Sequence, residues 1–561
     1  MTTALAGEGG REEKSLRASK GLAAIAAGCF LAASLFSPLS PSAQESPSEQ
    51  IPVLEGHIKL GVSSIVEDGN ASSTIEAYNL SRGLRLSSLF LRGVAGETRT
   101  ISVDLHDVSR HQANASVEFS ETGLLNVKFD YSRLRYLESA SGNSESVRDA
   151  TGVSGNLTPT KWLKLYGTLS DQERRGGRVA YLTDDLDFPG SLYDYSIKSR
   201  SIGAQLRARR RSFEVSREWR QFSSEANSPL NREGRRLRVA GMYGLTRGVT
   251  LSGSYVSDQS VLEHTDEALV MRSYSGVLEL RPAGYVTLAG YANHKNTQND
   301  VTGEVVRTLS AGSKVDVSLR RAVFVEGGYE FTKRNDEPDG SDPSLAERQV
   351  STDAFIAGLT ARLSEKARLT VRYKTRNTDR TLYGGLTGPF DTDYFLAKVE
   401  GRATPNLQYA LSFEDKERSN DELMSSSWTR GPSLFADWTL ALPGRTVGLR
   451  LNGSGFKTSY SDLNRSFETD NFLVSARLRL PVFGRLTAET GVTHIDVRGD
   501  LDIRKDIVAA SLEYAVGAGY AVEARYDLFS YDDFLNYPNN YAGNVFTLSL
   551  SKRFSALGRG D

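Results

Sequence analysis

Cysteine is nearly absent from this chain of 561 residues, which contains a single one, Cys29. Cys29 lies within the apolar run of residues 21–36, and no thiol follows it. Disulfides, thiolate metal sites, cysteine nucleophiles and haem attachment through Cys-x-x-Cys-His are therefore excluded downstream of it. Residues 26–29 resemble a lipoprotein cleavage box only loosely, because position 26 lacks the usual leucine. Lipidation is the minor alternative for this segment.

Long apolar runs are also missing after the first fifty residues, although 39% of all residues are hydrophobic. No later stretch approaches the roughly 20 apolar residues that a membrane helix requires. A helical membrane protein is thereby excluded. A membrane β-barrel is not excluded, because its strands are apolar on one face only.

Neither sign of charge is in excess, since 68 basic residues stand against 69 acidic ones. The two signs are interleaved along the chain, so no net attraction to nucleic acid is expected. Charge balance therefore gives no sign of a nucleic-acid partner.

The residues that would carry catalysis or bind metal are few and scattered. The six histidines show no metal-ligand spacing: His57, His106, His111, His264, His294 and His494. No Gly-x-Ser-x-Gly elbow stands out, and Pro338 breaks any EF-hand register in the acidic segment 336–342, which is better explained as a solvated loop. We therefore expect no enzyme, no catalytic residues, no metal and no cofactor of its own.

The amino-terminal residues have the composition of an export signal. Basic residues from Arg11 to Lys20 precede the apolar run, which is followed by a small-residue stretch ending at Ala43. We expect residues 1–43 to be a Sec signal peptide, 44–55 a short periplasmic segment, 56–554 the barrel and 555–561 a periplasmic tail.

From residue 56 onward, segments of about ten residues alternate apolar with polar, a period-two pattern that predicts strands. The apolar positions, expected to contact lipid, include Leu125, Val127, Phe129, Leu369, Val371 and Tyr373. The polar positions, expected to line the interior, include Arg207, Arg209, Arg236, Arg238, Arg368, Arg372, Lys374, Glu400, Glu523 and Arg525.

Tight turns divide these segments into hairpins. They fall near Gly96, Gly123, Pro159, Arg211, Arg247, Ala283, Arg321, Glu365, Pro405, Gly444, Gly484 and Ala518. Two strands and one longer, acidic loop fit between successive turns, as in an antiparallel up-and-down outer-membrane β-barrel with short periplasmic turns and longer external loops. The pattern predicts about 26 strands. A soluble all-β repeat such as a propeller is the alternative, but its strands would be shorter and less charged.

The last predicted strand, residues 544–554, has an aromatic-ended apolar face. Phe546, Leu548, Leu550 and Phe554 share that face, like the closing strand that barrel assembly machinery recognises. We therefore expect the cell outer membrane as the location and its lipid as the surroundings.

A ring of about 26 strands would be roughly 50 Å across between backbones and would enclose roughly 30 Å after side chains. Left open, such a hole would leak metabolites, yet the sequence shows no plug domain before the first strand. The charged inner positions suit a polar protein surface as the filling.

Several segments of the first hairpins resemble the MtrB/PioB family. They are Glu76-Ala-Tyr-Asn-Leu-Ser-Arg-Gly83, residues 84–93, Val103-Asp-Leu-His-Asp107 and Phe129-Asp-Tyr131. The resemblance implies an outer-membrane porin that sheathes a periplasmic multihaem (decahaem) c-type cytochrome, so that electrons cross to an external multihaem cytochrome or a mineral. Some members have a cysteine pair near the mature amino terminus, which this chain lacks. A passive diffusion porin and a structural or adhesive barrel are the alternative functions.

Overall fold

The structure is a computed structural model that describes residues 53–70, 82–95, 98–109, 112–137, 145–177, 192–224, 230–319, 322–337, 348–381, 391–420, 424–442, 445–462 and 466–556. The predicted signal peptide, His111, the tail beyond residue 556, and much of the acidic segment and of the family-like segment 76–83 lie outside these residues. Among the described residues, no helix has the length and apolar character to cross a bilayer.

The described residues form 26 strands and one short 3-10 helix. In chain order they are β1 (Val53–Gly69), β2 (Gly83–Ala95), β3 (Arg99–Val108), β4 (Ala113–Glu121), β5 (Leu125–Leu137), β6 (Glu145–Thr160), β7 (Leu163–Gly177), β8 (Leu192–Ala208), β9 (Arg211–Ser224), β10 (Arg232–Gly244), β11 (Val249–Leu262), β12 (Ala268–Ala283), β13 (Val286–Asn299), β14 (Val305–Leu319), β15 (Val323–Glu337), β16 (Arg348–Ser364), β17 (Ala367–Thr381), β18 (Asp391–Thr404), β19 (Leu407–Asn420), β20 (Ser425–Leu442), β21 (Arg445–Ser461), β22 (Ser466–Phe483), β23 (Leu486–Gly499), β24 (Ile503–Gly517), β25 (Tyr520–Asp533), η4 (Tyr537–Asn539) and β26 (Tyr541–Ala556).

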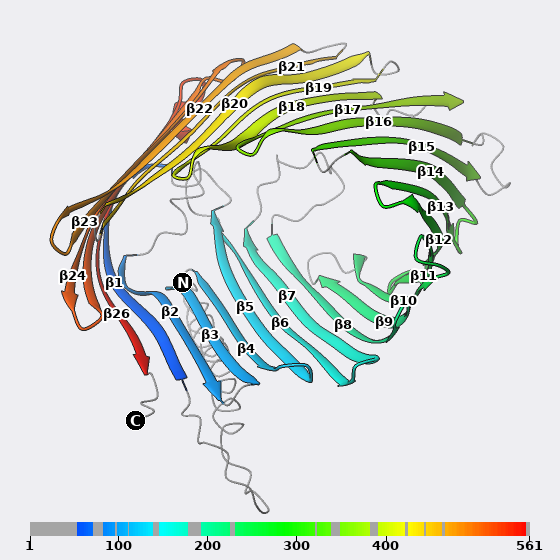
Figure 1. The fold of residues 1–561 in the computed structure, drawn as a ribbon, viewed down its shortest axis with the longest axis horizontal. Helices are drawn as coiled ribbons and strands as arrows, with labels where there is room; N and C mark the ends of the chain where they lie inside the picture. Colours follow the sequence, from blue (N-terminus) through cyan, green and yellow to red (C-terminus); the bar gives the residue numbers. More distant parts are fainter. Residues whose placement is uncertain are drawn as a thin grey trace, which may run out of the picture.

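Each strand pairs antiparallel with its neighbours in the sequence, and the sheet closes on itself. β1 pairs with β26 from Leu54 opposite Ala556 to Gly69 opposite Tyr541. Figure 1 shows the result as a ring in which the red β26 lies beside the blue β1. The predicted 26-stranded antiparallel up-and-down barrel is confirmed. Because the sheet is closed, it presents no open edge for another chain to pair with.

The connections alternate in length around the ring. Those at one end, such as residues 365–366 between β16 and β17, are short and fall where the turn-rich segments predicted them. Those at the other end reach from residue 178 to 191 between β7 and β8. By the rule for outer-membrane barrels, the short-turn end is periplasmic and the other end is external.

Several strands are longer than the ten residues expected from the sequence. β20 and β22 each have 18 residues. Residues 530–543, which the sequence predicts as one of the external loops, are half strand, because β25 continues to Asp533 and β26 begins at Tyr541. The antiparallel ladder satisfies the backbone in water as well as in lipid, so it continues beyond the apolar part of the wall.

Relative exposure identifies the inner face of the wall. In β26, Thr547 and Ser549 are 2% and 4% exposed, whereas Leu548 and Leu550 are both 51% exposed. Side chains crowd together on the concave side of a ring and spread apart on the convex side, so Thr547 and Ser549 face inward. Residues that pair directly across two strands share a face. The strand registers therefore carry this assignment around the whole ring and back to β1.

The outward positions form an apolar belt. Along β22 the outward residues run from Phe472 to Val482 and include Val474 and Leu480, all well exposed. Ten residues at about 3.3 Å each, tilted by about 40°, rise roughly 25 Å. This height matches the lipid-facing band of an outer-membrane barrel.

Tyrosines mark the external border of the belt. The hydroxyls of the outward Tyr131, Tyr373 and Tyr526 donate hydrogen bonds to Asp149, Asp393 and Asn544 at 3.0, 2.9 and 2.7 Å. Tyr329 makes the same contact with Asp353. In each case the acceptor lies on the neighbouring strand, one pleat farther from the short turns. Tyrosines with an apolar ring and a hydrated hydroxyl are typical of a membrane–water interface.

Candidate functional site on the inner wall

The predicted site residues fall on two faces of the wall. The registers place Arg207, Arg236, Arg238, Arg368, Arg372, Lys374, Glu400, Glu523 and Arg525 on the inner face. They place Leu125, Val127, Phe129, Leu369, Val371, Tyr373, Phe546, Leu548, Leu550 and Phe554 on the outer face.

Arg209 takes no position on a strand. It lies in the turn between β8, which ends at Ala208, and β9, which begins at Arg211. The ladder stops at the pair formed by those two residues. The strand register that predicted an inner position for Arg209 therefore does not extend that far.

Hydroxyl pairs make much of the inner wall polar without giving it charge. Ser254 and Ser275 lie 2.7 Å apart between their hydroxyl oxygens, and Ser412 and Ser433 lie 2.6 Å apart. Such pairs form where two short polar side chains face each other across neighbouring strands. The wall between the charged groups is therefore hydrophilic and of low relief.

Most acidic groups of the inner wall have a basic neighbour. Arg525 Nε lies 2.8 Å from Asp527, and an Arg450 terminal nitrogen lies 2.7 Å from Asp437. Lys59 of β1 pairs with Glu523 of β25 across the closing strand β26. The wall near the ring closure is therefore charged but locally neutral.

One part of the wall is strongly basic, and we call it the basic sector. It comprises the inward cations of β16 to β19: Arg362, Arg368, Arg372, Lys374, Arg376, Lys398, Arg402, Lys416 and Arg418. Glu400 and Glu414 are the inward acids on those strands within the described residues. In Figure 1 these strands lie together on one side of the ring, in green to yellow.

Only part of the basic sector is neutralised. Arg372 lies 2.8 Å from Glu326 of β15, which also attracts Lys314 at 3.4 Å. Glu400 is shared by Lys398 and, at 3.9 Å, by Arg368.

The remaining cations of the sector have no ion pair with any residue that the structure describes: Arg362, Lys374, Arg376, Arg402, Lys416 and Arg418. Like charges held side by side on one wall repel one another. A complementary acidic surface would relieve this repulsion.

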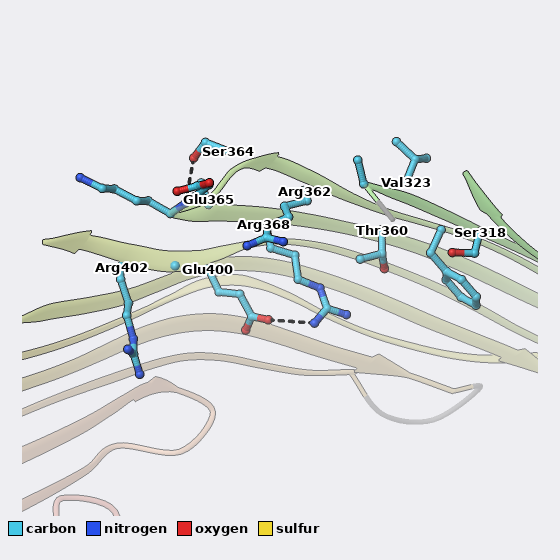
Figure 2. Close-up of a pocket in the computed structure, with 14 residues that line it drawn as sticks. Ser318, Val323, Thr360, Arg362, Ser364, Glu365, Arg368, Glu400 and Arg402 are labelled. Carbon is cyan, nitrogen blue, oxygen red and sulfur yellow. Dashed lines mark hydrogen bonds and ion pairs between the residues drawn. The ribbon is translucent and has the colours of Figure 1, made fainter. Parts of the chain in front are cut away.

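A cavity of about 440 Å³ lies at the short-turn end of the sector. Figure 2 shows Arg368 reaching Glu400, whereas Arg362 and Arg402 extend from the flanking strands without such a partner. Phe324 and Thr360 are among the other residues that line it. The cavity therefore continues the basic sector toward the periplasmic rim.

The part of the inner wall that is described offers a broad surface for binding. No group of three His, Cys, Asp or Glu side chains that could hold a metal ion occurs among those residues. The His106 and His494 rings contact Asp104 and Asp506, each at 2.6 Å, as isolated pairs. A broad wall of half-exposed cations is suited to a macromolecular surface.

The sequence interpretation identified three members of the basic sector, Arg368, Arg372 and Lys374. It missed the other six: Arg362, Arg376, Lys398, Arg402, Lys416 and Arg418. All of them continue the period-two pattern of their strands, so extending the register of β17 to its neighbours would have found them. What the pattern could not give is which cations lack an acid across the ladder. That depends on the register between strands.

Comparisons with known proteins give no family. No family model matches the chain, and no curated protein matches it. Among solved structures, it is similar to the ferric yersiniabactin uptake receptor FyuA from Yersinia pestis, with a TM-score of 0.43 and 13% identity, over 91% of this chain and 81% of that one. It is also similar to the copper transporter OprC, with a TM-score of 0.44 and 9% identity, over 91% of this chain and 81% of that one. At TM-scores this low, these likenesses carry no information on ligands or partners.

The wall itself gives the class of protein. The structure combines three features: a closed ring of 26 strands, an apolar outer belt with tyrosines at its border, and a hydrated, charged inner wall. An outer-membrane β-barrel requires these features, since its outer face meets hydrocarbon and its inner face meets water or a polar partner.

Proposed function

We propose that this chain is a porin-like sheath in the outer membrane that encloses a multihaem c-type cytochrome. The pair would form a transmembrane conduit for extracellular electron transfer. The observation that carries the proposal is the basic sector on the inner wall of so wide a ring. The family-like segments of the first hairpins point to the same function.

The width of the ring supports a protein partner. Twenty-six strands about 4.8 Å apart, tilted by about 40°, give a ring roughly 50 Å across. Side chains reduce the inner width to roughly 30 Å, which is the diameter of a small folded domain. Small solutes alone do not require a hole of this size.

The chemistry of the wall supports a polar and acidic partner. Haem propionates and carboxylate side chains on a cytochrome surface would neutralise the unpaired cations of the basic sector. Cations that remain solvated contribute mainly to orientation and to the rate of encounter, because their attraction is screened by salt. We therefore expect the basic sector to set how the cytochrome is oriented inside the ring.

Co-expression with candidate multihaem cytochromes tests the proposal. We expect one of them to co-purify with the barrel in detergent at one to one, with a haem spectrum, and to be protected from protease. Barrels reconstituted in vesicles with that cytochrome should pass electrons from an internal dye to an external acceptor. If no multihaem cytochrome binds and the isolated barrel gives a small, stable, selective conductance, the proposal fails and a passive porin is favoured.

Charge reversal tests the role of the basic sector. Arg376→Glu, Lys416→Glu and Arg418→Glu together should weaken cytochrome binding, with the loss smaller at high salt. The matched control is Arg307→Glu, Lys333→Glu and Arg504→Glu, which reverses three cations on the outer face above the tyrosine border. Equal loss in both variants would contradict an orienting role for the inner wall.

A further inference from the structure

The outer face of β8 to β10 carries a group of cations that the proposed function does not use. We call Lys198, Arg200, Arg217 and Arg235 the outer basic patch; all four are exposed. Arg200 and Arg235 pair with Trp219 from its two sides, on β8 and β10. Arg217 lies one pleat below Trp219, with its guanidinium carbon 5.0 Å from the indole ring centre.

The patch lies at the external border of the apolar belt. Directly below it, the outward residues Ile202, Phe213 and Leu237 are 62%, 48% and 38% exposed. Trp219 is 37% exposed and replaces the tyrosine that marks this border on other strands. Tryptophan prefers the level of lipid headgroups. The cations therefore lie where the headgroups of the outer leaflet would be.

Several cations elsewhere on the outer face at this end have carboxylate partners. Arg430 lies 2.8 Å from Asp415, and Arg498 lies 2.6 Å from Asp496. Arg133 has Asp149 at 3.8 Å. In these places the wall supplies its own counter-ion.

The outer basic patch differs, because none of its four cations has an ion pair within the described part of the chain. The nearest outward acids by register are Asp171, opposite Lys198, and Glu233, one pleat above Arg235. Neighbouring strands are about 4.8 Å apart, so Arg200 and Arg235 flank β9 at about 10 Å from each other. Unpaired guanidinium groups this close attract an external anion.

We propose that the outer basic patch binds the phosphate groups of an outer-leaflet lipid headgroup. Guanidinium groups bind phosphate through two parallel hydrogen bonds, and three arginines on adjacent strands can reach more than one phosphate. The acyl chains of the same lipid would lie against Ile202, Phe213 and Leu237. A free phosphate ion would lack these apolar contacts, so the site selects a phosphorylated lipid.

Lipid binding to the purified barrel in detergent tests this inference, with native mass spectrometry as the measurement. The probes are a diphosphorylated glucosamine lipid of the lipid A type, the same lipid without phosphates, and inorganic phosphate. We expect the phosphorylated lipid to bind at least about tenfold more tightly than either of the others. Equal binding of the dephosphorylated lipid, or equal binding of inorganic phosphate, would overturn the inference.

Variants locate the site. Arg200→Gln, Arg217→Gln and Arg235→Gln together should lower the affinity for the phosphorylated lipid about tenfold or more. The control with Arg133→Gln, Arg430→Gln and Arg498→Gln should retain it. Heat-modifiability on a gel checks that each barrel is folded. If the triple patch variant does not fold, the single variant Arg235→Gln is tested in its place. Unchanged affinity in a folded patch variant would refute the proposal, whatever cytochrome the barrel binds.

Discussion

Two residues on opposite faces of β17 should differ in how strongly a change of charge destabilises the barrel. Leu369 faces outward opposite Val399, and Arg372 faces inward opposite Leu396. Leu369 lies four residues from Tyr373, the border tyrosine of this strand. At about 3.3 Å per residue and a tilt of about 40°, it lies roughly 10 Å inside the belt, close to the bilayer midplane.

The magnitude follows from these positions. Leu369→Arg places a charge against hydrocarbon and should cost about 2 to 4 kcal/mol, which lowers the folding equilibrium constant roughly 30- to 900-fold. Arg372→Glu removes a pair with Glu326 in which the arginine side chain is 51% exposed, so it should cost about 1 kcal/mol or less. Lys314 remains at 3.4 Å from Glu326 and limits the new repulsion.

Urea unfolding in lipid vesicles measures both free energies, with gel heat-modifiability as the check on assembly. We expect Leu369→Arg to fold poorly and Arg372→Glu to fold nearly as the unchanged chain. If Arg372→Glu were the more destabilising of the two, the assignment of inner and outer faces would be wrong. The basic sector would then face lipid, which is not tenable for so many charges.

Three shorter predictions follow from the same wall. The purified protein should give a β-rich circular dichroism spectrum and require detergent, and substantial helix would contradict the closed sheet. Without its partner, the barrel should form an unusually large pore in a planar bilayer or be cleaved quickly by periplasmic proteases. Replacing Leu548 by Asp should impair assembly more than replacing Thr547 by Ser, measured by gel shift, because Leu548 faces lipid on the closing strand while Thr547 faces inward.

Much of the fold could be predicted from the sequence because a barrel is encoded locally. Each strand alternates apolar and polar residues, and each hairpin has its own turn, as at residues 365–366 between β16 and β17. Antiparallel neighbours need no long-range information to find each other. The number of turns therefore predicts the number of strands. An antiparallel series of that many membrane strands is expected to close into a ring.

Strand ends and pair partners could not be predicted in the same way. β25 continues to Asp533 although its last residues are polar, because backbone pairing persists where side chains meet water. Arg372 forms its ion pair with Glu326 of β15, two strands away. The Glu326 side chain reaches it by lying over Gly358 of the intervening β16. A single strand's alternation gives the face of Arg372 and says nothing about which acid it reaches.

Paired and unpaired cations of the wall have different explanations. A paired cation is accounted for by the barrel alone, whereas an unpaired cation indicates a binding surface. Arg525 and Arg450 lie on the inner face beside their own acids, so solvation and local neutrality explain their presence. The same explanation fails for Lys374 and Arg376, which the barrel would hold more easily as serine or threonine, the residues used elsewhere along the inner wall. On the outer face, local neutrality also does not explain Arg235. It does explain Arg430, which forms an ion pair with Asp415. Cations that the wall leaves without a counter-ion are therefore the places where we expect something outside the chain to supply one: an acidic protein surface within the ring and a lipid phosphate around it.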